Sequence, residues 1–308
     1  MTGAASRITL LHAWIVSLRL RTLPLACCGI LTGNAVAFAQ SGRWQARTFW
    51  LSLCTALLLQ ILANLANDYG DFSKAADTPR RLGPRRGMQL GLISPAAMRG
   101  AILCVTLLAI LSGSLLLFTA GHSRQDIVLF LLLGLFSLVA ALTYTIGRHA
   151  YGYHGLGDLA VLVFFGWVAV GGSFYLQTRA LAWPVFLPAT ACGLLSAVVL
   201  NVNNLRDLEE DLRHGKITFA AMLGMRWAKI YVQILLLASL LCLAAFALLC
   251  LPHRPWAWLF LIALPFFHQN AAILRRARQP EDFQPQLATA LKLNMAALGG
   301  LAAGLLVR

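Results

Sequence analysis

Nine runs of predominantly apolar residues follow one another along this chain of 308 residues, and each is long enough to cross a bilayer. They cover residues 23–40, 48–66, 96–120, 127–145, 156–177, 183–203, 228–250, 256–274 and 287–307. In lipid, a chain must satisfy its backbone hydrogen bonds internally, and a helix of about 20 apolar residues does so while it spans the hydrocarbon core. The pattern therefore predicts an all-α membrane protein of nine transmembrane helices. Because the runs take up most of residues 1–308, a single polytopic membrane domain is expected.

The basic residues are distributed unevenly over the connections between these runs. If the amino terminus and the connection after each even-numbered run share one side, 19 of the 25 Lys and Arg residues lie on that side. By the positive-inside rule, that side is cytoplasmic and the carboxyl terminus lies outside. The net charge of +14 is thus chiefly a signal of membrane topology. Nucleic-acid binding is disfavoured, because the basic residues are spread over separate loops.

Two short acidic blocks interrupt the apolar pattern, each at the cytoplasmic end of an even-numbered run. The first acidic block covers residues 64–71, and the second acidic block covers residues 203–211. Together with Asp77, which follows the first block, they hold seven of the 11 acidic residues. Each block is followed by a long polar loop. The separation in sequence between Asn67 and Asn203 equals that between Asp71 and Asp207. This repetition predicts a distant duplication, with two pseudo-repeated halves that each carry one acidic block.

Side chains that bear oxygen recur within each block at a helical spacing. Asn67 and Asp71 lie four residues apart, as do Asn203 and Asp207, and Asp211 extends the second series. Residues four apart share one face of a helix, so each block is expected to present its oxygens on one side. Carboxylates at the end of a membrane span are costly and usually mark function. A set of ligands made only of oxygen favours Mg²⁺ over softer metals.

Basic residues accompany both blocks, and each of them has two interpretations. The first loop carries Arg81 and Arg86 among glycines, and the second carries Lys216. Near the start of the chain, Arg19 and Arg21 lie where the first run meets the cytoplasm. Each of these cations can be a topology charge. Alternatively, they can bind phosphate oxygens beside the metal ligands, as a metal-bridged diphosphate requires.

A further cytoplasmic stretch, residues 144–158, is rich in aromatic residues. Tyr144 and Tyr153 can belong to an interfacial aromatic belt, with Arg148 as a topology charge, or all three can contact a substrate. Asp158 differs from them, because it opens an apolar run and is costly there unless it is paired.

These features together suit one kind of chemistry, in which a metal-bound diphosphate is the leaving group. Withdrawing electrons from that group promotes ionisation of an allylic C–O bond, and an electron-rich acceptor then attacks the allyl cation. An apolar helical bundle with acidic residues at its cytoplasmic end provides a site at the membrane surface for the diphosphate and a channel for its isoprenyl chain. Such a chain partitions into lipid with about 0.8 kcal/mol per buried CH₂, which explains a membrane location.

Five motifs, in this order, resemble those of the UbiA-type intramembrane aromatic prenyltransferases, and especially the branch that prenylates 1,4-dihydroxy-2-naphthoate. They are Leu18-Arg-Leu-Arg-Thr-Leu-Pro-Leu25, Asn64-Leu-Ala-Asn-Asp-Tyr-Gly-Asp71, Arg81-Leu-Gly-Pro-Arg-Arg-Gly87, Gly152-Tyr-His-Gly-Leu-Gly-Asp158 and Asn203-Asn-Leu-Arg-Asp-Leu-Glu-Glu-Asp211 with Gly215-Lys216. The resemblance covers about residues 12–226, and the last third of the chain matches only as apolar spans.

The resemblance implies nine transmembrane helices around a central cavity, with short helices in the cytoplasmic loops forming a cap. The implied reaction joins a polyprenyl diphosphate to 1,4-dihydroxy-2-naphthoate, with loss of diphosphate and CO₂, and gives demethylmenaquinone. The implied location is the cytoplasmic (inner) membrane of a bacterium, with the amino terminus and the active site on the cytoplasmic side. No protein partner is predicted.

The resemblance also assigns roles to individual residues. Mg²⁺ is the implied cofactor, and its implied ligands are Asn67, Asp68, Asp71, Asn203, Asp207 and Asp211. Asp71 and Asp207 are the implied catalytic pair, and Asp158 and Tyr153 are candidates for removing the ring proton or assisting decarboxylation. The implied diphosphate contacts are Arg81, Arg86 and Lys216. Beside them, Arg21, Tyr144 and Arg148 are candidate substrate contacts on the basis of their positions in the sequence.

Two alternatives stay open at this point. Within the same class, the acceptor can be 4-hydroxybenzoate, as in ubiquinone biosynthesis. In a different class, a secondary transporter also has repeated halves and intramembrane acids, although its acids are expected near the midplane and not at the cytoplasmic ends. The family usually has a third aspartate about four residues after the position of Asp71, and Asp77 lies six residues after it, so its role as a ligand stays open too.

Overall fold

The computed structural model of the protein describes residues 3–74, 86–120 and 123–307. Within these ranges, nine helical segments are long and apolar enough to cross a membrane, which confirms the number predicted from the apolar runs. They are Leu10–Ser41, Ala46–Ser73, Pro95–Ala120, Arg124–Thr143, Gly157–Thr178, Trp183–Arg206, Phe219–Cys250, Pro255–Arg276 and Pro280–Leu306.

The described part of the chain contains twelve α-helices and six segments of 3₁₀- or π-helix. The α-helices are α1 (Gly3–Leu18), α2 (Leu23–Ser41), α3 (Ala46–Ser73), α4 (Pro95–Ala120), α5 (Arg124–Thr143), α6 (Gly157–Val161), α7 (Gly172–Thr178), α8 (Phe186–Arg206), α9 (Leu208–Arg213), α10 (Phe219–Cys250), α11 (Leu264–Arg276) and α12 (Gln284–Leu306). The shorter pieces are η1 (Leu20–Thr22), η2 (Tyr151–Tyr153), the π-helical η3 (Leu162–Gly171), η4 (Trp183–Val185), η5 (Pro255–Ala263) and η6 (Pro280–Phe283).

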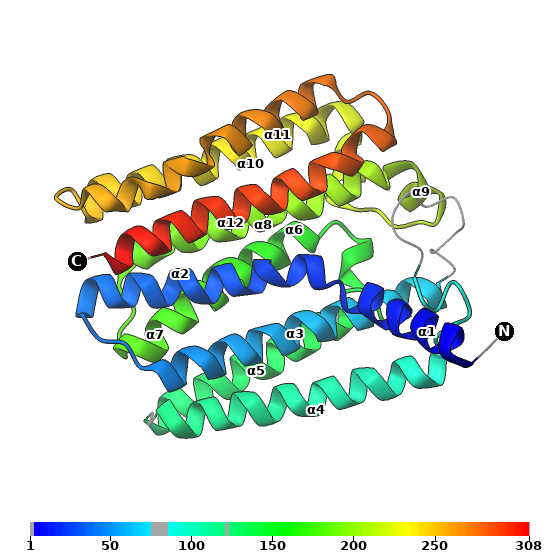
Figure 1. Ribbon diagram of the computed structural model, residues 1–308, viewed down its shortest axis with the longest axis horizontal. Coiled ribbons are helices and arrows are strands. Elements are labelled where there is room, and N and C mark those ends of the chain that lie inside the picture. The colour runs from blue at the N-terminus through cyan, green and yellow to red at the C-terminus, as the bar shows by residue number, and fades with distance from the viewer. Residues whose placement is uncertain (1–2, 75–85, 121–122, 308) are drawn as a thin grey trace.

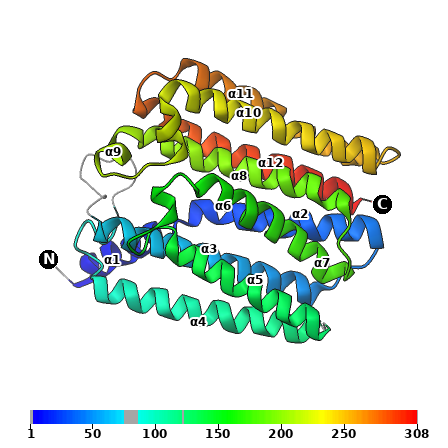
Figure 2. The same ribbon diagram turned by 180° about the vertical axis from the view of Figure 1, so that it is seen from behind.

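The spans run side by side along the long axis of the molecule (Figure 1, Figure 2). The helices α3, α4 and α5 form one edge of the bundle, α10 and α11 form the opposite edge, and α2, α8 and α12 lie between them. The two chain termini lie at opposite ends, as an odd number of spans requires. Both α3 and α8 end at the same end of the bundle as the amino terminus.

Glycines let the central helices approach one another closely. A Cβ atom on Gly33 of α2 would lie only 2.2 Å from the backbone oxygen of Val170 in η3. A Cβ atom on Gly166 of η3 would lie 2.6 Å from the backbone oxygen of Ala189 in α8. Because a side chain at either position would collide with backbone, small residues set the spacing of these helices, as is common in membranes.

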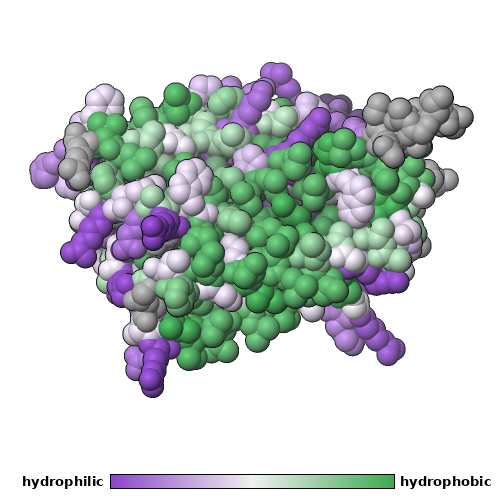
Figure 3. All heavy atoms as spheres, turned by 60° about the horizontal axis from the view of Figure 1, so that its bottom comes forward, coloured by the Kyte–Doolittle hydropathy of each residue, from purple (hydrophilic) through white to green (hydrophobic). Residues whose placement is uncertain are grey.

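The outer surface is apolar over the middle of the bundle, and polar residues gather toward its ends (Figure 3). Large apolar side chains are exposed along α4 and α5, among them Leu111, Phe118, Leu132 and Phe136. In a soluble protein such a surface would be a serious aggregation liability. It is the surface expected of helices that face lipid.

Three local features of the helices are not predicted by the apolar runs. Arg19 adopts a left-handed backbone conformation (φ 51°) and separates α1 from α2 within the first span. The helix α3 continues past residue 66 to Ser73, so that the first acidic block is helical. Gly224 (φ 71°) kinks α10 near its start. Hydropathy does not report these features, because each is set by local backbone geometry or by pairing of polar groups.

Candidate active site

Both acidic blocks lie at one end of the bundle, as the predicted topology requires (Figure 1). Asn67 and Asp71 both lie within α3. In the second block, the backbone bends at Asp207 (φ −96°, ψ 7°), between α8 and α9. Hydrogen bonds still run from the Asp207 N–H to the Asn203 carbonyl (3.0 Å) and from the Asp211 N–H to the Asp207 carbonyl (2.8 Å). The predicted helical spacing therefore holds in both blocks.

Two carboxylates of the first block share one buried guanidinium group. Arg86 Nε lies 3.2 Å from Asp68 Oδ1, and Arg86 Nη1 donates to Asp71 Oδ2 at 2.9 Å. The three side chains are each no more than 4% exposed. A buried charge costs several kcal/mol unless it is paired, so the carboxylates and the guanidinium stabilise one another. Arg86 thus belongs to the acidic cluster and is not a solvent-facing topology charge.

Arg19 approaches the same block from the turn between α1 and η1. Its Nη2 atom donates to Asp68 Oδ1 at 2.8 Å. With the Asn67 amide in the orientation that satisfies its neighbours, the amide oxygen accepts from Arg19 Nη1 at 3.0 Å and from Nη2 at 2.9 Å. The left-handed backbone of Arg19 is uncommon for a residue with a side chain. A hydrogen bond from Asn64 Nδ2 to the Leu18 carbonyl (3.0 Å) supports the turn.

Lys216 connects the first acidic block to the second. Its Nζ atom lies 3.9 Å from Asp71 Oδ2 and 3.6 Å from Asp211 Oδ1. The loop that carries it is tied to the aromatic stretch, since the Ile217 N–H donates to the Tyr153 carbonyl at 3.2 Å. Carboxylates that lie far apart in the sequence are therefore neighbours at a single cation.

Asp207 is paired with its own sequence neighbour. Arg206 Nε donates to Asp207 Oδ1 and Arg206 Nη2 donates to Asp207 Oδ2, both at 2.7 Å. Both side chains are buried. Such a bidentate, charge-assisted pair is among the stronger hydrogen-bonded arrangements in proteins, and it fixes the direction of the carboxylate.

Tyr153 joins the cluster from η2. Its hydroxyl donates to Asp71 Oδ1 at 2.9 Å, and the ammonium group of Lys74 lies 3.8 Å from the centre of its ring. Burial raises the pKa of the Tyr153 hydroxyl well above its usual value, and the negative charge of Asp71 adds to this shift. Burial also lowers the pKa of the Lys74 ammonium, against the opposing effect of Asp71. Tyr153 is therefore a hydrogen-bond donor over the whole physiological pH range.

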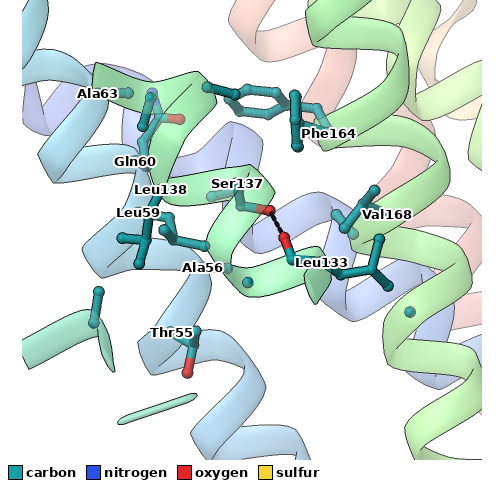
Figure 4. A pocket seen from close by; sticks show the side chains of 18 of the residues that line it. Thr55, Ala56, Leu59, Gln60, Ala63, Leu133, Ser137, Leu138, Phe164 and Val168 are labelled. Atoms are coloured by element: carbon teal, nitrogen blue, oxygen red, sulfur yellow. Dashed lines mark hydrogen bonds between the residues drawn. The ribbon is translucent and has the colours of Figure 1, made fainter. Parts of the chain in front are cut away.

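A cavity of about 560 Å³ extends from the acidic blocks into the bundle. Its walls come from α2, α3, α4, α5, α8 and the fifth span. Along α3 its lining residues extend from Ser52 to Asn67, a helix length of about 22 Å. Leu59, Leu138 and Phe164 are among the side chains around its middle (Figure 4). The cavity is thus a long apolar chamber with its polar end at the acidic blocks.

Several hydroxyl groups on the cavity wall donate to carbonyl groups of their own helices. Ser137 Oγ donates to the Leu133 carbonyl at 2.7 Å (Figure 4). Thr55 Oγ1 donates in the same way to the Leu51 carbonyl at 2.8 Å. Because these groups already have partners, the middle of the cavity suits an apolar ligand.

The end of the cavity nearest the acidic blocks is polar and aromatic. Arg19, Asn67, Asn203 and Tyr144 line it. Among the described residues that line the cavity, Arg19 alone carries a charge. The Tyr144 ring meets the Tyr151 ring edge to face, with 5.3 Å between their centres, and burial raises the pKa of the Tyr144 hydroxyl above its usual value. This end can accommodate an anionic group beside an aromatic ring.

The sequence profile of the UbiA prenyltransferase family matches residues 25–296, which is most of the chain. This chain belongs to the UbiA prenyltransferase family. The match extends beyond the five motifs into the last third of the sequence, where only apolar spans had suggested a relationship.

Among curated relatives, members of this family from three bacteria carry the same name, 1,4-dihydroxy-2-naphthoate octaprenyltransferase. The protein of Escherichia coli (strain K12) is 48% identical over 286 residues, which cover 93% of this chain and 92% of the relative. The protein of Haemophilus influenzae is 42% identical over 280 residues, 90% of each chain. The protein of Mycobacterium tuberculosis is 34% identical over 279 residues, 89% of this chain and 90% of the relative.

Solved structures of distant family members share the fold. The apo structure of a UbiA homolog from Aeropyrum pernix K1 superimposes with a TM-score of 0.62 at 19% identity, over 97% of this chain and 98% of the homolog. A UbiA homolog from Archaeoglobus fulgidus, bound to GPP and Mg²⁺, gives a TM-score of 0.59 at 14% identity, over 94% of this chain and 99% of the homolog. The predicted fold class, an all-α bundle of the UbiA type, is thereby confirmed.

Asp158 occupies a buried position behind the cavity wall. Its Oδ1 atom accepts hydrogen bonds from Asn201 Nδ2 of α8 and from the Tyr231 hydroxyl of α10, the latter at 3.2 Å. Its Oδ2 atom is buried without a hydrogen-bond partner. Its neighbour Gly157 lines the cavity, whereas Asp158 is not among the described residues that do so. The carboxylate thus fastens α6 to α8 and α10.

Other predicted site residues fall outside the cluster. Arg21 and Arg148 are exposed and are not among the described residues that line the cavity. Arg81 and Asp77 lie outside the described residues.

One cation of the site, Arg206, was missed by the sequence reasoning, although it lies within a recognised motif. Its adjacency to Asp207, a predicted metal ligand, was a usable signal. Arg19 and Arg21 were both left open as diphosphate contacts, and the structure pairs Arg19 with Asp68 and leaves Arg21 exposed. The left-handed backbone of Arg19 leaves no trace in the sequence.

The donor atoms of the two blocks are oxygens, which suits Mg²⁺ in kind. Within the described residues, no group of three or more His, Cys, Asp and Glu side chains is assembled for a metal ion. Mg²⁺ commonly takes only one or two carboxylates and completes its shell with water and substrate phosphates, so this arrangement is compatible with it. Asp68 Oδ2, buried and without a hydrogen-bond partner, is one donor atom in place. The residues therefore fit a Mg²⁺–diphosphate pair better than a bare metal ion.

Proposed function

We propose that this protein transfers a polyprenyl group from polyprenyl diphosphate to 1,4-dihydroxy-2-naphthoate, with release of diphosphate and CO₂, and so makes demethylmenaquinone. The observation that carries the proposal is that two acidic blocks meet at Lys216, while Asn67 and Asn203 of the same two blocks line one end of a long apolar cavity. The shared name of the bacterial relatives supports the choice of acceptor.

The diphosphate would lie between the two acidic blocks. Oxygens of Asn67, Asp68, Asp71, Asn203, Asp207 and Asp211 would hold Mg²⁺ there, and the ion would supply positive charge to stabilise the leaving group. Arg19, Arg86 and Lys216 already lie among these carboxylates and would take up part of the remaining negative charge. Arg81, in the same loop as Arg86, stays a predicted contact.

The isoprenyl chain would extend into the cavity from this end. The wall is apolar over most of its length, and hydroxyls such as that of Ser137 donate within their own helices. Burial of the chain contributes roughly 0.8 kcal/mol per CH₂, which holds the donor in place while the reacting carbon stays near the diphosphate. The apolar wall also excludes water, which would otherwise capture the allyl cation.

The aromatic acceptor would lie beside Tyr144, at the polar end of the cavity. The edge-to-face pair of Tyr144 and Tyr151 provides aromatic surface next to Asn203. The raised pKa of the Tyr144 hydroxyl keeps its proton available for a hydrogen bond to the acceptor. Arg148, which is exposed near this stretch, stays a predicted contact.

Tyr153 and Asp158 would act mainly by holding other groups in position. The Tyr153 hydroxyl donates to Asp71 and so fixes one oxygen of that carboxylate, which leaves the other toward the cations. Asp158 ties α6 to α8 and α10 and so holds Gly157 at the cavity wall. Direct proton transfer by either residue stays a prediction from the sequence.

We further propose a Mg²⁺-dependent enzyme of the bacterial cytoplasmic membrane, with the acidic blocks on the cytoplasmic side. The distribution of 19 of the 25 basic residues on that side supports the orientation. The solved homolog bound to GPP and Mg²⁺ supports use of this metal in the family.

A transfer assay with two acceptors tests the function. Membranes that contain the protein are incubated with radiolabelled polyprenyl diphosphate, Mg²⁺, and either 1,4-dihydroxy-2-naphthoate or 4-hydroxybenzoate. We expect a labelled lipid product and release of CO₂ with the naphthoate. A product formed only with 4-hydroxybenzoate would overturn the choice of acceptor, and no product with either acceptor would overturn the proposed reaction.

A further inference from the structure

A second group of cations lies at the same end of the bundle as the acidic blocks, but on the edge formed by α10 and α11 (Figure 1). We call this group the basic corner, and it comprises Arg226, Lys229, Arg275, Arg276 and Arg278. Lys229 Nζ of α10 donates to the Ala277 carbonyl at the end of α11, at 2.9 Å. This hydrogen bond brings the cations of the two helices together.

The basic corner differs from the acidic site in how its charges are compensated. Arg86, Arg206 and Lys216 each pair with a carboxylate of the acidic blocks. Within the ranges that the structure describes, none of the five corner cations forms an ion pair. Nearby, Asp282 accepts hydrogen bonds from the N–H groups of Arg278 and Gln279, and its carboxylate thereby caps η6. Besides Asp282, only the exposed Glu281 brings a negative charge close to the corner along the chain.

An apolar stripe on α10 leads away from the basic corner along the bundle. It consists of the exposed side chains of Trp227, Ile230, Ile234, Leu237 and Leu241. Their spacing of three and four residues places them on one face of the helix. Trp227 lies next to Arg226, whose guanidinium carbon is 5.8 Å from the centre of its ring. Tryptophan at this position, between cations and an apolar stripe, is typical of the membrane interface.

We propose that the basic corner binds the phosphate headgroup of an anionic phospholipid of the bilayer, whose acyl chains lie along the apolar stripe. The cations attract the negatively charged headgroup, since each Lys or Arg near a membrane surface strengthens binding of anionic lipid by about fivefold. The site lies on a different edge of the bundle from the cavity-forming helices α3, α4 and α5, and it does not depend on the proposed reaction.

Fluorescence quenching at Trp227 tests this site directly. Purified protein is placed in phosphatidylcholine nanodiscs that contain a small fraction of brominated phosphatidylglycerol or brominated phosphatidylcholine, and the signal of Trp227 is isolated by subtracting that of Trp227→Phe. We expect stronger quenching by the brominated phosphatidylglycerol. The double variant Arg275→Gln, Arg276→Gln should reduce that preference by about fivefold for each charge removed.

A matched control lies at the other end of the same helical edge. Arg254 lies two residues before the exposed Trp256, just beyond the far end of α10, so Arg254→Gln should leave the preference at Trp227 unchanged. Equal quenching by the two lipids, or an unchanged preference in the double variant, would overturn the proposal. Loss of the preference in millimolar inorganic phosphate, or in a trace of polyprenyl diphosphate, would reassign the corner to a free anion or to the donor substrate and would overturn it too. Melting curves in phosphatidylcholine alone check that the variants are folded.

Discussion

Replacing Arg86 by Met removes a guanidinium group that two buried carboxylates of the first acidic block share. Its contacts with Asp71 Oδ2 at 2.9 Å and with Asp68 Oδ1 at 3.2 Å each correspond to roughly 5–6 kcal/mol of attraction at an effective dielectric constant of about 20. Much of this is offset by the cost of burying the guanidinium. Removing one partner of such a buried pair typically destabilises a protein by about 3–5 kcal/mol.

The assay is the apparent melting temperature of the purified protein, followed by tryptophan fluorescence at one scan rate, because membrane proteins often unfold irreversibly. We expect Arg86→Met to melt roughly 6–15 °C below the wild type. Arg21, at the same end of the bundle, is exposed. The control Arg21→Met should therefore melt within about 1–2 °C of the wild type. Added Mg²⁺ should raise the melting temperature of Arg86→Met more than that of the wild type, since a divalent cation replaces the lost charge. If Arg86→Met melted like Arg21→Met, the buried-pair reasoning would be refuted.

Three further outcomes follow from the site. Asp71→Ala and Asp207→Ala should each eliminate prenyl transfer while the protein still inserts in the membrane, as measured by product formation and membrane fractionation; near-normal activity of both would contradict the metal–diphosphate assignment. Tyr153→Phe removes the hydrogen bond to Asp71 and should lower kcat roughly tenfold or more. Because the Tyr153 pKa is raised above its usual value of about 10, the hydroxyl stays protonated, and the ratio of wild-type to variant kcat should be constant from about pH 6 to about pH 9; a ratio that declines as pH rises would contradict this. A Cβ atom on Gly134 would meet no atom within 4 Å, so Gly134→Leu should project into the cavity and lower kcat/KM for a long donor roughly tenfold more than for a short one. Gly100→Leu, with equally open surroundings on α4 but away from the cavity, should change neither value.

Much of the fold could be predicted because lipid imposes simple rules on sequence. Nine apolar runs gave nine helical spans in the described residues, and the basic loops placed both acidic blocks at one end of the bundle. The helical spacing of Asn67 and Asp71 held in α3. Each of these predictions rests on a property that is local in sequence, either hydropathy or residue spacing. The division into two repeated halves stays a prediction.

The details of the cation set could not be predicted in the same way. A topology charge and a site charge are the same residue types at the same membrane depth, so Arg21 and Arg86 looked alike in the sequence. The structure exposes Arg21 and buries Arg86 between two carboxylates. Arg19 reaches Asp68 from a left-handed backbone position at the turn before α2. Side-chain direction at a helix break is a tertiary property and leaves little trace in a single sequence.

Equilibrium binding of a non-reactive donor analogue tests most directly whether the two acidic blocks form one Mg²⁺–diphosphate clamp. A geranyl thiodiphosphate is titrated into the purified wild type, Asp71→Asn and Asp207→Asn, each with Mg²⁺ and with a chelator. We expect tight binding only for the wild type with Mg²⁺, and loss of most of the Mg²⁺-dependent affinity when either block is altered, because both blocks hold the same ligand. Full Mg²⁺-dependent affinity in either single variant would contradict a shared clamp.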